Sequence, residues 1–151
     1  MGIEIERKFL VIGEIPAGES TELIQAYLSL DPDRTVRVRI DDESASITIK
    51  GRTTRATRVE FEYSIPLEDG RQLLPMAEGS PVEKIRHRIP VGDHIWEVDV
   101  FSGDNAGLIV AEIELESENE SFDLPDWIGE DVTENPRYLN ACLAQNPYSN
   151  W

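Results

Sequence analysis

The sequence predicts a single-domain, mainly β protein (α+β class) in which about eight antiparallel strands close into a barrel, with a few helices at its edges. Two observations predict the strands: seven segments alternate apolar and polar residues with a period of two, and short turn sequences separate them. A third observation, the gathering of charges of both signs on the polar face, predicts closure. A chain of 151 residues is long enough for one core, so the predicted domain spans residues 1–151.

The predicted strands follow one another along the chain and end at turn-forming residues such as Asp31-Pro32-Asp33. They are Ile3–Leu10, Ile24–Leu30, Thr35–Ile40, Ala45–Lys50, Arg58–Ile65, Val82–Ile89, Ile95–Phe101 and Leu108–Leu115, of which Ile24–Leu30 is the most apolar. Short connections favour antiparallel neighbours. Helices are predicted over Glu19–Leu23, Pro66–Met76 and Asn135–Gln145.

Within these strands, the alternation places charged residues on one face of the sheet. That face holds Glu4, Glu6, Lys8, Arg37, Arg39, Lys50, Arg58, Glu60, Glu62, Lys84, Arg86, Arg88, Glu97, Asp99, Glu112, Glu114 and Glu116. The opposite face holds apolar residues, among them Ile3, Phe9, Val38, Trp96 and Ile113. A solvated outer face is the usual explanation for charged strand positions. All three lysines of the chain share this face, however, so we interpret it as the inside of a barrel whose apolar exterior is covered by helices and loops.

Charges inside a barrel are tolerated only where they pair with one another or hold water, metal or a ligand. Several cations that converge with carboxylates are typical of a site for a polyanion and a hard divalent metal. The spacing of Glu4 and Glu6 directs both carboxylates to the same side of a strand. Zinc would favour histidine or thiolate ligands, and the inward set contains neither.

The overall composition narrows the classes of partner. A net charge of −16 argues against nucleic acid and anionic membranes, because an acidic protein repels phosphate backbones at long range. The N-terminus is charged where a signal peptide is apolar, so the cytoplasm is the expected compartment. We expect a monomer or homodimer. The single cysteine, Cys142, has apolar neighbours, which favours a structural thiol.

The opening Glu4-Ile5-Glu6-Arg7-Lys8, of pattern E-x-E-x-K, resembles the signature of the CYTH superfamily, the triphosphate tunnel metalloenzymes. Similar motifs follow in family order over nearly the whole chain: Gln25-Ala26-Tyr27-Leu28, Arg37-Val38-Arg39, Thr48-Ile49-Lys50, Glu60-Phe61-Glu62, Glu83-Lys84-Ile85-Arg86, Glu97-Val98-Asp99, Glu112-Ile113-Glu114 and the tail around Tyr138-Leu139-Asn140. The resemblance implies a closed eight-stranded antiparallel β-barrel tunnel with a charged lumen. The compact length is similar to that of bacterial members described as inorganic triphosphatases.

The resemblance also implies roles for individual residues and a small-molecule triphosphate as the partner. The implied ligands of Mg²⁺ or Mn²⁺ are Glu4, Glu6, Glu112 and Glu114. The implied phosphate-binding residues are Lys8, Arg37, Arg39, Lys50, Lys84, Arg86 and Arg58. Tyr27 either reaches the ligand or is a buried structural residue. The C-terminal segment that ends at Trp151 either packs on the barrel or gates one opening.

Phosphoanhydride hydrolysis requires in-line positioning of water and neutralisation of charge on the phosphoryl oxygens. Our hypothesis gives Lys84 a catalytic role at the growing charge, and gives either Glu60 or Glu62, or a second metal, the role of orienting the water. A class IV adenylate cyclase or a thiamine triphosphatase would have similar phosphate-binding residues. A sensor of polyphosphate or nucleotide that binds without turnover is the alternative without catalysis.

Overall fold

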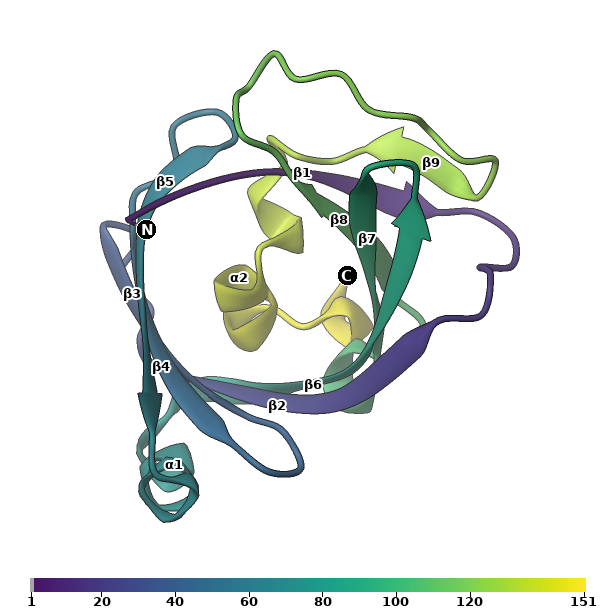
Figure 1. Cartoon of the computed structure of the whole chain (residues 1–151). Helices are drawn as coiled ribbons and strands as arrows, with labels where there is room; N and C mark the ends of the chain where they lie inside the picture. The colour runs from purple at the N-terminus through teal and green to yellow at the C-terminus, as the bar shows by residue number, and fades with distance from the viewer. Residues whose placement is uncertain (1) are drawn as a thin grey trace.

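A computed structural model describes residues 2–151 as a nine-stranded antiparallel sheet bent into a ring (Figure 1). Its strands are β1 (Ile3–Val11), β2 (Glu19–Ser29), β3 (Arg34–Ile40), β4 (Ala45–Gly51), β5 (Thr57–Ile65), β6 (Glu78–Val91), β7 (His94–Phe101), β8 (Ile109–Glu114) and β9 (Ile128–Asp131). The order in the sheet is β5-β4-β3-β2-β6-β7-β8-β1-β9, and β5 also pairs with β1. Strands β1 to β8 therefore form a ring, which confirms the predicted eight-stranded antiparallel tunnel.

Strand β1 closes the ring because its two halves have different partners on one side. Its first residues pair with β5, in the register Ile3↔Val59, Glu4↔Arg58 and Ile5↔Thr57. Its last residues pair instead with β9, while its other edge pairs with β8 from Glu6 to Leu10. The closing contact is short, and it carries Glu4 and Arg58 at adjacent positions.

The predicted helix over Glu19–Leu23 is wrong, because these residues form the first half of β2. They pair with β6 in a continuous antiparallel register that includes Thr21↔Arg86 and Leu23↔Lys84. The hydrogen bonds to a strand about sixty residues away outweigh the weak local preference of this segment. Strand β6 extends beyond the predicted Val82–Ile89 because Glu78 pairs with Tyr27 of β2 at one end, and Pro90 and Val91 pair with β7 at the other.

The structure confirms a helix after β5 and divides the predicted C-terminal helix into two pieces. Helix α1 (Leu67–Leu73) continues into the 3-10 turn η1 (Leu74–Met76). The C-terminal segment contains the 3-10 turn η3 (Pro136–Tyr138) and the helix α2 (Asn140–Gln145), interrupted because Leu139 is extended with ψ of 136°. Two further 3-10 turns are η2 (Gly103–Asn105) and η4 (Tyr148–Asn150).

Helix α2 closes one end of the tunnel (Figure 1). Its buried residue Leu143 packs with Val82, Phe101 and Val110. These three residues point into the ring, because each lies two positions along its strand from an inward-facing charged residue, namely Lys84, Asp99 or Glu112. Helix α2 of the C-terminal segment therefore packs inside the ring against inward-facing residues of β6, β7 and β8. Trp151 lies against Tyr138 and Tyr148, with ring centroids 5.2 and 5.0 Å away.

The apolar exterior is covered on only part of the ring, by residues 115–131 around Trp96 and by α1 where it packs on β3 and β4. Around Trp96, the residues 115–131 cover β1, β7 and β8, and Phe122 and Trp127 contact the Trp96 ring with centroids 5.9 Å away. On β5, however, Phe61 and Tyr63 are 46% and 57% exposed. The prediction of a fully covered exterior is thus wrong for β5. Within residues 2–151, no helix combines the length and the apolar character needed to cross a bilayer.

Candidate functional site

The lumen of the ring holds a cavity of about 220 Å³ that is lined almost entirely by charged side chains. Every site residue predicted from the sequence lines it: Glu4, Glu6, Lys8, Tyr27, Arg37, Arg39, Lys50, Arg58, Glu60, Glu62, Lys84, Arg86, Glu112 and Glu114. Three lining residues lay outside the predicted site. Arg88 and Glu97 lie on the charged face, so the two-residue alternation of their strands could have identified them. Asn140 comes from α2, where no such alternation applies.

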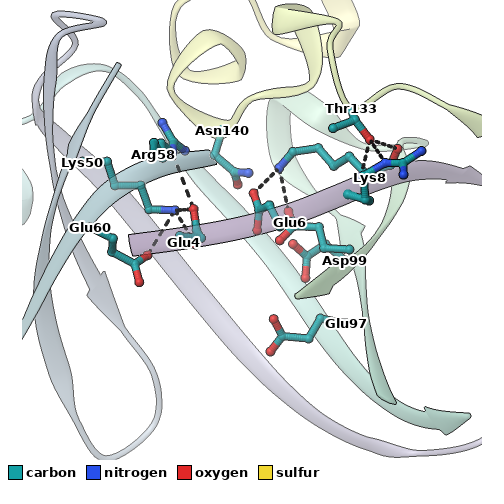
Figure 2. Close-up of polar contacts among 12 residues, drawn as sticks. Glu4, Glu6, Lys8, Lys50, Arg58, Glu60, Glu97, Asp99, Thr133 and Asn140 are labelled. Atoms are coloured by element: carbon teal, nitrogen blue, oxygen red, sulfur yellow. Dashed lines mark hydrogen bonds and ion pairs between the residues drawn. The ribbon is translucent and has the colours of Figure 1, made fainter. Parts of the chain in front are cut away.

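The first group of charges surrounds Glu4 on β1 (Figure 2). The Lys50 Nζ atom lies 2.9 Å from Glu4 Oε1, and Arg58 Nε lies 3.5 Å from the same oxygen. Lys50 also pairs with Glu60 at 3.4 Å. Two basic side chains of the protein itself therefore neutralise Glu4.

Lys8 lies between carboxylates of two neighbouring strands. Its Nζ atom is 2.9 Å from Glu112 Oε1 and 3.3 Å from Glu6 Oε1. Burial disfavours the ammonium, but the attraction of Glu112 and Glu6 is larger and raises the pKa of Lys8. The ammonium of Lys8 therefore bridges β1 and β8 inside the lumen.

Carboxylates stand directly opposite each other at two places in the sheet. Glu6 on β1 is paired with Glu114 on β8, and Glu112 on β8 is paired with Glu97 on β7. Like charges opposite each other destabilise a sheet unless a cation lies between them. Burial, followed by the repulsion of Glu112, raises the pKa of Glu6. Burial and then Glu4 raise the pKa of Glu114, so this wall of the lumen has an excess of negative charge.

Asp99 is the fully buried acceptor at the closed end of the lumen. Arg86 binds it with both ends of its guanidinium, at 2.8 Å from Nε and 2.9 Å from Nη2. Lys84 Nζ lies 2.7 Å from Asp99 Oδ2. Although burial acts in the opposite direction, Lys84 and Arg86 together lower the pKa of Asp99. One carboxylate thus holds two cations, and Arg86 is also paired with Glu97 at 3.3 Å and with Glu112 at 3.8 Å.

Burial is the main cause of the low pKa of Lys84. Burial of the ammonium lowers the pKa of Lys84 to about 7, against the attraction of Asp99 and with the repulsion of Arg86. The ion pair with Asp99 does not prevent the shift, because Arg86 already binds both oxygens of that carboxylate. A further anion in the lumen would therefore stabilise the charged form of Lys84.

Two arginines of β3 retain unused donors. Arg37 donates from Nη2 to Thr48 Oγ1 at 3.2 Å, but its buried Nε atom has no hydrogen-bond partner among residues 2–151. Arg39 donates from Nε to the neutral Gln25 Oε1 at 2.8 Å. Among the described residues, no carboxylate oxygen lies within 4.0 Å of the Arg39 guanidinium. Burial, and then Arg37, lowers the pKa of Arg39 to about 10.

Tyr27 lies at the boundary between the lumen and the apolar core. It lines the cavity, and it also packs with Val82 and Leu143 in the apolar cluster under α2. Burial raises the pKa of the half-buried Cys142 thiol, in agreement with a structural residue. The described part of the chain contains no preformed cluster of three or more His, Cys, Asp or Glu side chains arranged to hold a metal ion.

Comparison with known proteins places the chain among CYTH proteins. The family model of the CYTH domain matches residues 2–142. A protein of Acetivibrio thermocellus named inorganic triphosphatase is 43% identical, over 100% of this chain and 99% of its own. One of Nitrosomonas europaea with the same name is 38% identical, over 93% and 96%. A crystal structure of an inorganic triphosphatase, 37% identical, superposes with a TM-score of 0.68 over 93% of each chain.

Proposed function

Because this chain belongs to the CYTH domain family, we propose that it is a divalent-metal-dependent inorganic triphosphatase that hydrolyses tripolyphosphate in the lumen. The names of relatives similar over almost their whole length support the activity. The observation that carries the proposal is the set of unsatisfied cations in the cavity. Arg37 has a buried Nε donor without a partner among residues 2–151, and Arg39 has no carboxylate oxygen within 4.0 Å in the same residues. Lys84 shares its carboxylate with Arg86.

The phosphate groups would be bound by cations from several strands. The proposed set is Lys8, Arg37, Arg39, Lys50, Arg58, Lys84 and Arg86. Tyr27 lines the same cavity and is proposed as a further contact. Guanidinium groups bind phosphate oxygens in pairs, whereas lysines act as point charges. A short linear polyanion would therefore supply a counter-charge for Arg39, accept a hydrogen bond from the free Nε of Arg37 and add negative charge beside Lys84.

The acids of β1 and β8 fit a hard divalent cation. The proposed ligands are Glu4, Glu6, Glu112 and Glu114, and all are oxygen donors on adjacent strands. Glu114 faces Glu6 across the sheet. Among residues 2–151, no cationic nitrogen lies within 4.0 Å of the Glu114 carboxylate, whereas Glu6 is paired with Lys8. Mg²⁺ and Mn²⁺ accept few protein carboxylates and complete their coordination with phosphate oxygens and water, in agreement with a site that is not preformed by protein alone. A bound ion would neutralise charge on the phosphate oxygens.

Water would be oriented at the wall formed by β4 and β5. Glu62 accepts a hydrogen bond from Thr48 at 3.0 Å, and its nearest cation, Arg37, is 4.0 Å away. Glu60 is bound more closely by Lys50. Because Glu62 is half exposed and weakly paired, it is the better acceptor for a proton of the attacking water, with Glu60 as the alternative.

The substrate is tested by measuring products from three triphosphates. Wild-type protein is incubated with tripolyphosphate, ATP or thiamine triphosphate, each with Mg²⁺, with Mn²⁺ or with a chelator. We expect phosphate release to be fastest from tripolyphosphate and to stop in the chelator, because the acids of β1 and β8 then lack their cation. Cyclic AMP from ATP would instead assign a cyclase, and preference for thiamine triphosphate would assign that hydrolase. Binding without any product would leave the sensor as the function.

A further inference from the structure

Among residues 2–151, Asn140 is the one residue lining the cavity that does not come from a strand. It is the first residue of α2, the helix that closes the tunnel, and Figure 2 shows it among the charged side chains of the lumen. Its neutral amide is unusual in a cavity whose other lining residues, apart from Tyr27, are all charged.

The hydrogen bonds around Asn140 fix the orientation of its amide. The oxygen Oδ1 accepts from Lys84 Nζ at 2.9 Å and from Gln25 Nε2 at 3.2 Å. Gln25 is oriented in turn, since its Oε1 accepts from Arg39 Nε at 2.8 Å. A flipped Asn140 amide would bring its NH₂ group against the donors of Lys84 and Gln25. The Nδ2 group is thus directed away from both and donates to no acceptor in the described part of the chain.

The two amides link Lys84 and Arg39 without neutralising either cation. A carboxylate at either position would satisfy these charges, as Asp99 does for Arg86. An amide oxygen holds the donors in place and leaves their charge available for an anion. Gln25 is fully buried, so the link is held rigidly between β2, β3, β6 and α2.

From this geometry we propose that Asn140 is a substrate-binding residue, whose Nδ2 donates a hydrogen bond to a phosphoryl oxygen beside Lys84. Gln25 is the positioning residue that orients Asn140 and Arg39. The inference rests on the proposed function for the nature of the anion, tripolyphosphate. It assigns to α2 a direct contact with substrate in addition to its role in closing the tunnel.

The test measures tripolyphosphate affinity by titration calorimetry in a chelator, so that no turnover occurs. We expect Asn140→Ala to weaken binding by about tenfold or more, the value of one hydrogen bond to a charged group. Asn140→Asp should bind more weakly still, because it loses the donor and adds a negative charge. Asn146→Asp, at the exposed end of α2, is the matched charge control and should bind like the wild type.

A second control separates contact from docking of the helix. Leu143→Ala leaves a cavity under α2 without altering the lumen, so it should lower the melting temperature more than Asn140→Ala but the affinity less. Wild-type affinity in Asn140→Ala would overturn the proposal. So would an equal loss in Leu143→Ala, because Asn140 would then act only through attachment of the helix.

The positioning role of Gln25 is tested with the same titration. Gln25→Leu should also weaken the binding of tripolyphosphate. Asn140→Ala should reduce the affinity by a smaller factor in the Gln25→Leu background than in the wild type, because Gln25 acts partly through Asn140. Strictly multiplicative losses would overturn this role. Since affinity is measured without turnover, a wild-type protein that binds tripolyphosphate but never hydrolyses it would refute the proposed function alone. A wild-type protein that binds no tripolyphosphate in the chelator but hydrolyses it with Mg²⁺ or Mn²⁺ would overturn the contact proposed for Asn140 and leave the proposed function intact. One that neither binds nor hydrolyses tripolyphosphate would refute both.

Discussion

Replacing Lys84 with methionine is expected to lower kcat for tripolyphosphate by about 10²–10³-fold, and also to raise KM. Methionine has a similar length and preserves packing at this fully buried position. Asp99 keeps both contacts with Arg86, so no carboxylate is left unpaired. The lost ammonium would otherwise meet the charge that grows on the phosphoryl oxygens in the transition state, which is why the effect falls on kcat.

The matched control is Arg71→Met, which removes an exposed cation from α1 and should leave both kinetic constants unchanged. An increase in KM with unchanged kcat would contradict a role for Lys84 in the transition state. The variant should also change the pH dependence of stability without ligand. The folded protein releases the Lys84 proton at about pH 7, while the unfolded chain keeps it up to about 10.5. The free energy of unfolding from this group therefore rises with pH across that window, and Lys84→Met should lose this rise.

Replacing Asp99 with alanine is expected to give the largest loss of stability among the lumen variants, about 3–5 kcal/mol in the ligand-free protein. The carboxylate is fully buried, and its removal leaves Lys84 and Arg86 without the acceptor that both share. For a domain of this size, we expect the melting temperature to fall by about 10 °C. Thermal denaturation followed by circular dichroism measures the effect.

Tripolyphosphate should restore part of this loss, because its oxygens can replace the missing carboxylate. We therefore expect the ligand to raise the melting temperature of Asp99→Ala more than that of the wild type. The matched control, Asp42→Ala, removes an exposed carboxylate from the β3–β4 turn and should change neither value. A melting temperature for Asp99→Ala equal to that of the wild type would show that Asp99 is not the anchor of the two cations.

Much of the fold could be predicted because the strands alternate strictly. On β1, the charges at Glu4, Glu6 and Lys8 fix both the element and the side that faces the lumen. The first half of β2 could not be predicted in the same way, since Glu19, Ser20, Thr21 and Glu22 are all polar and their conformation depends on distant β6. The four-residue β9 is too short and too polar to show a period.

The candidate site was predictable for the same reason, and its limits have a physical cause. The alternation of residues along β6 and β7 places Arg86 and Asp99 inside the ring, but only the register of the two strands shows that they are direct neighbours. The sequence therefore could not separate acids that hold cations of the protein from acids that face each other, such as Glu6 and Glu114. The sequence showed Asn140 only as part of a family motif, because its position in the lumen depends on a helix distant in sequence.

The central claim is that the charged lumen hydrolyses a triphosphate with the help of a divalent cation. Its most direct test is ³¹P NMR of tripolyphosphate incubated with wild-type protein and Mg²⁺ or Mn²⁺, alongside Lys84→Met. We predict that the tripolyphosphate signals disappear while pyrophosphate and phosphate appear in equal amounts, rapidly for the wild type, slowly for the variant, and not in the presence of a chelator. Unchanged tripolyphosphate signals with either metal, or products formed equally fast in the chelator, would contradict the claim.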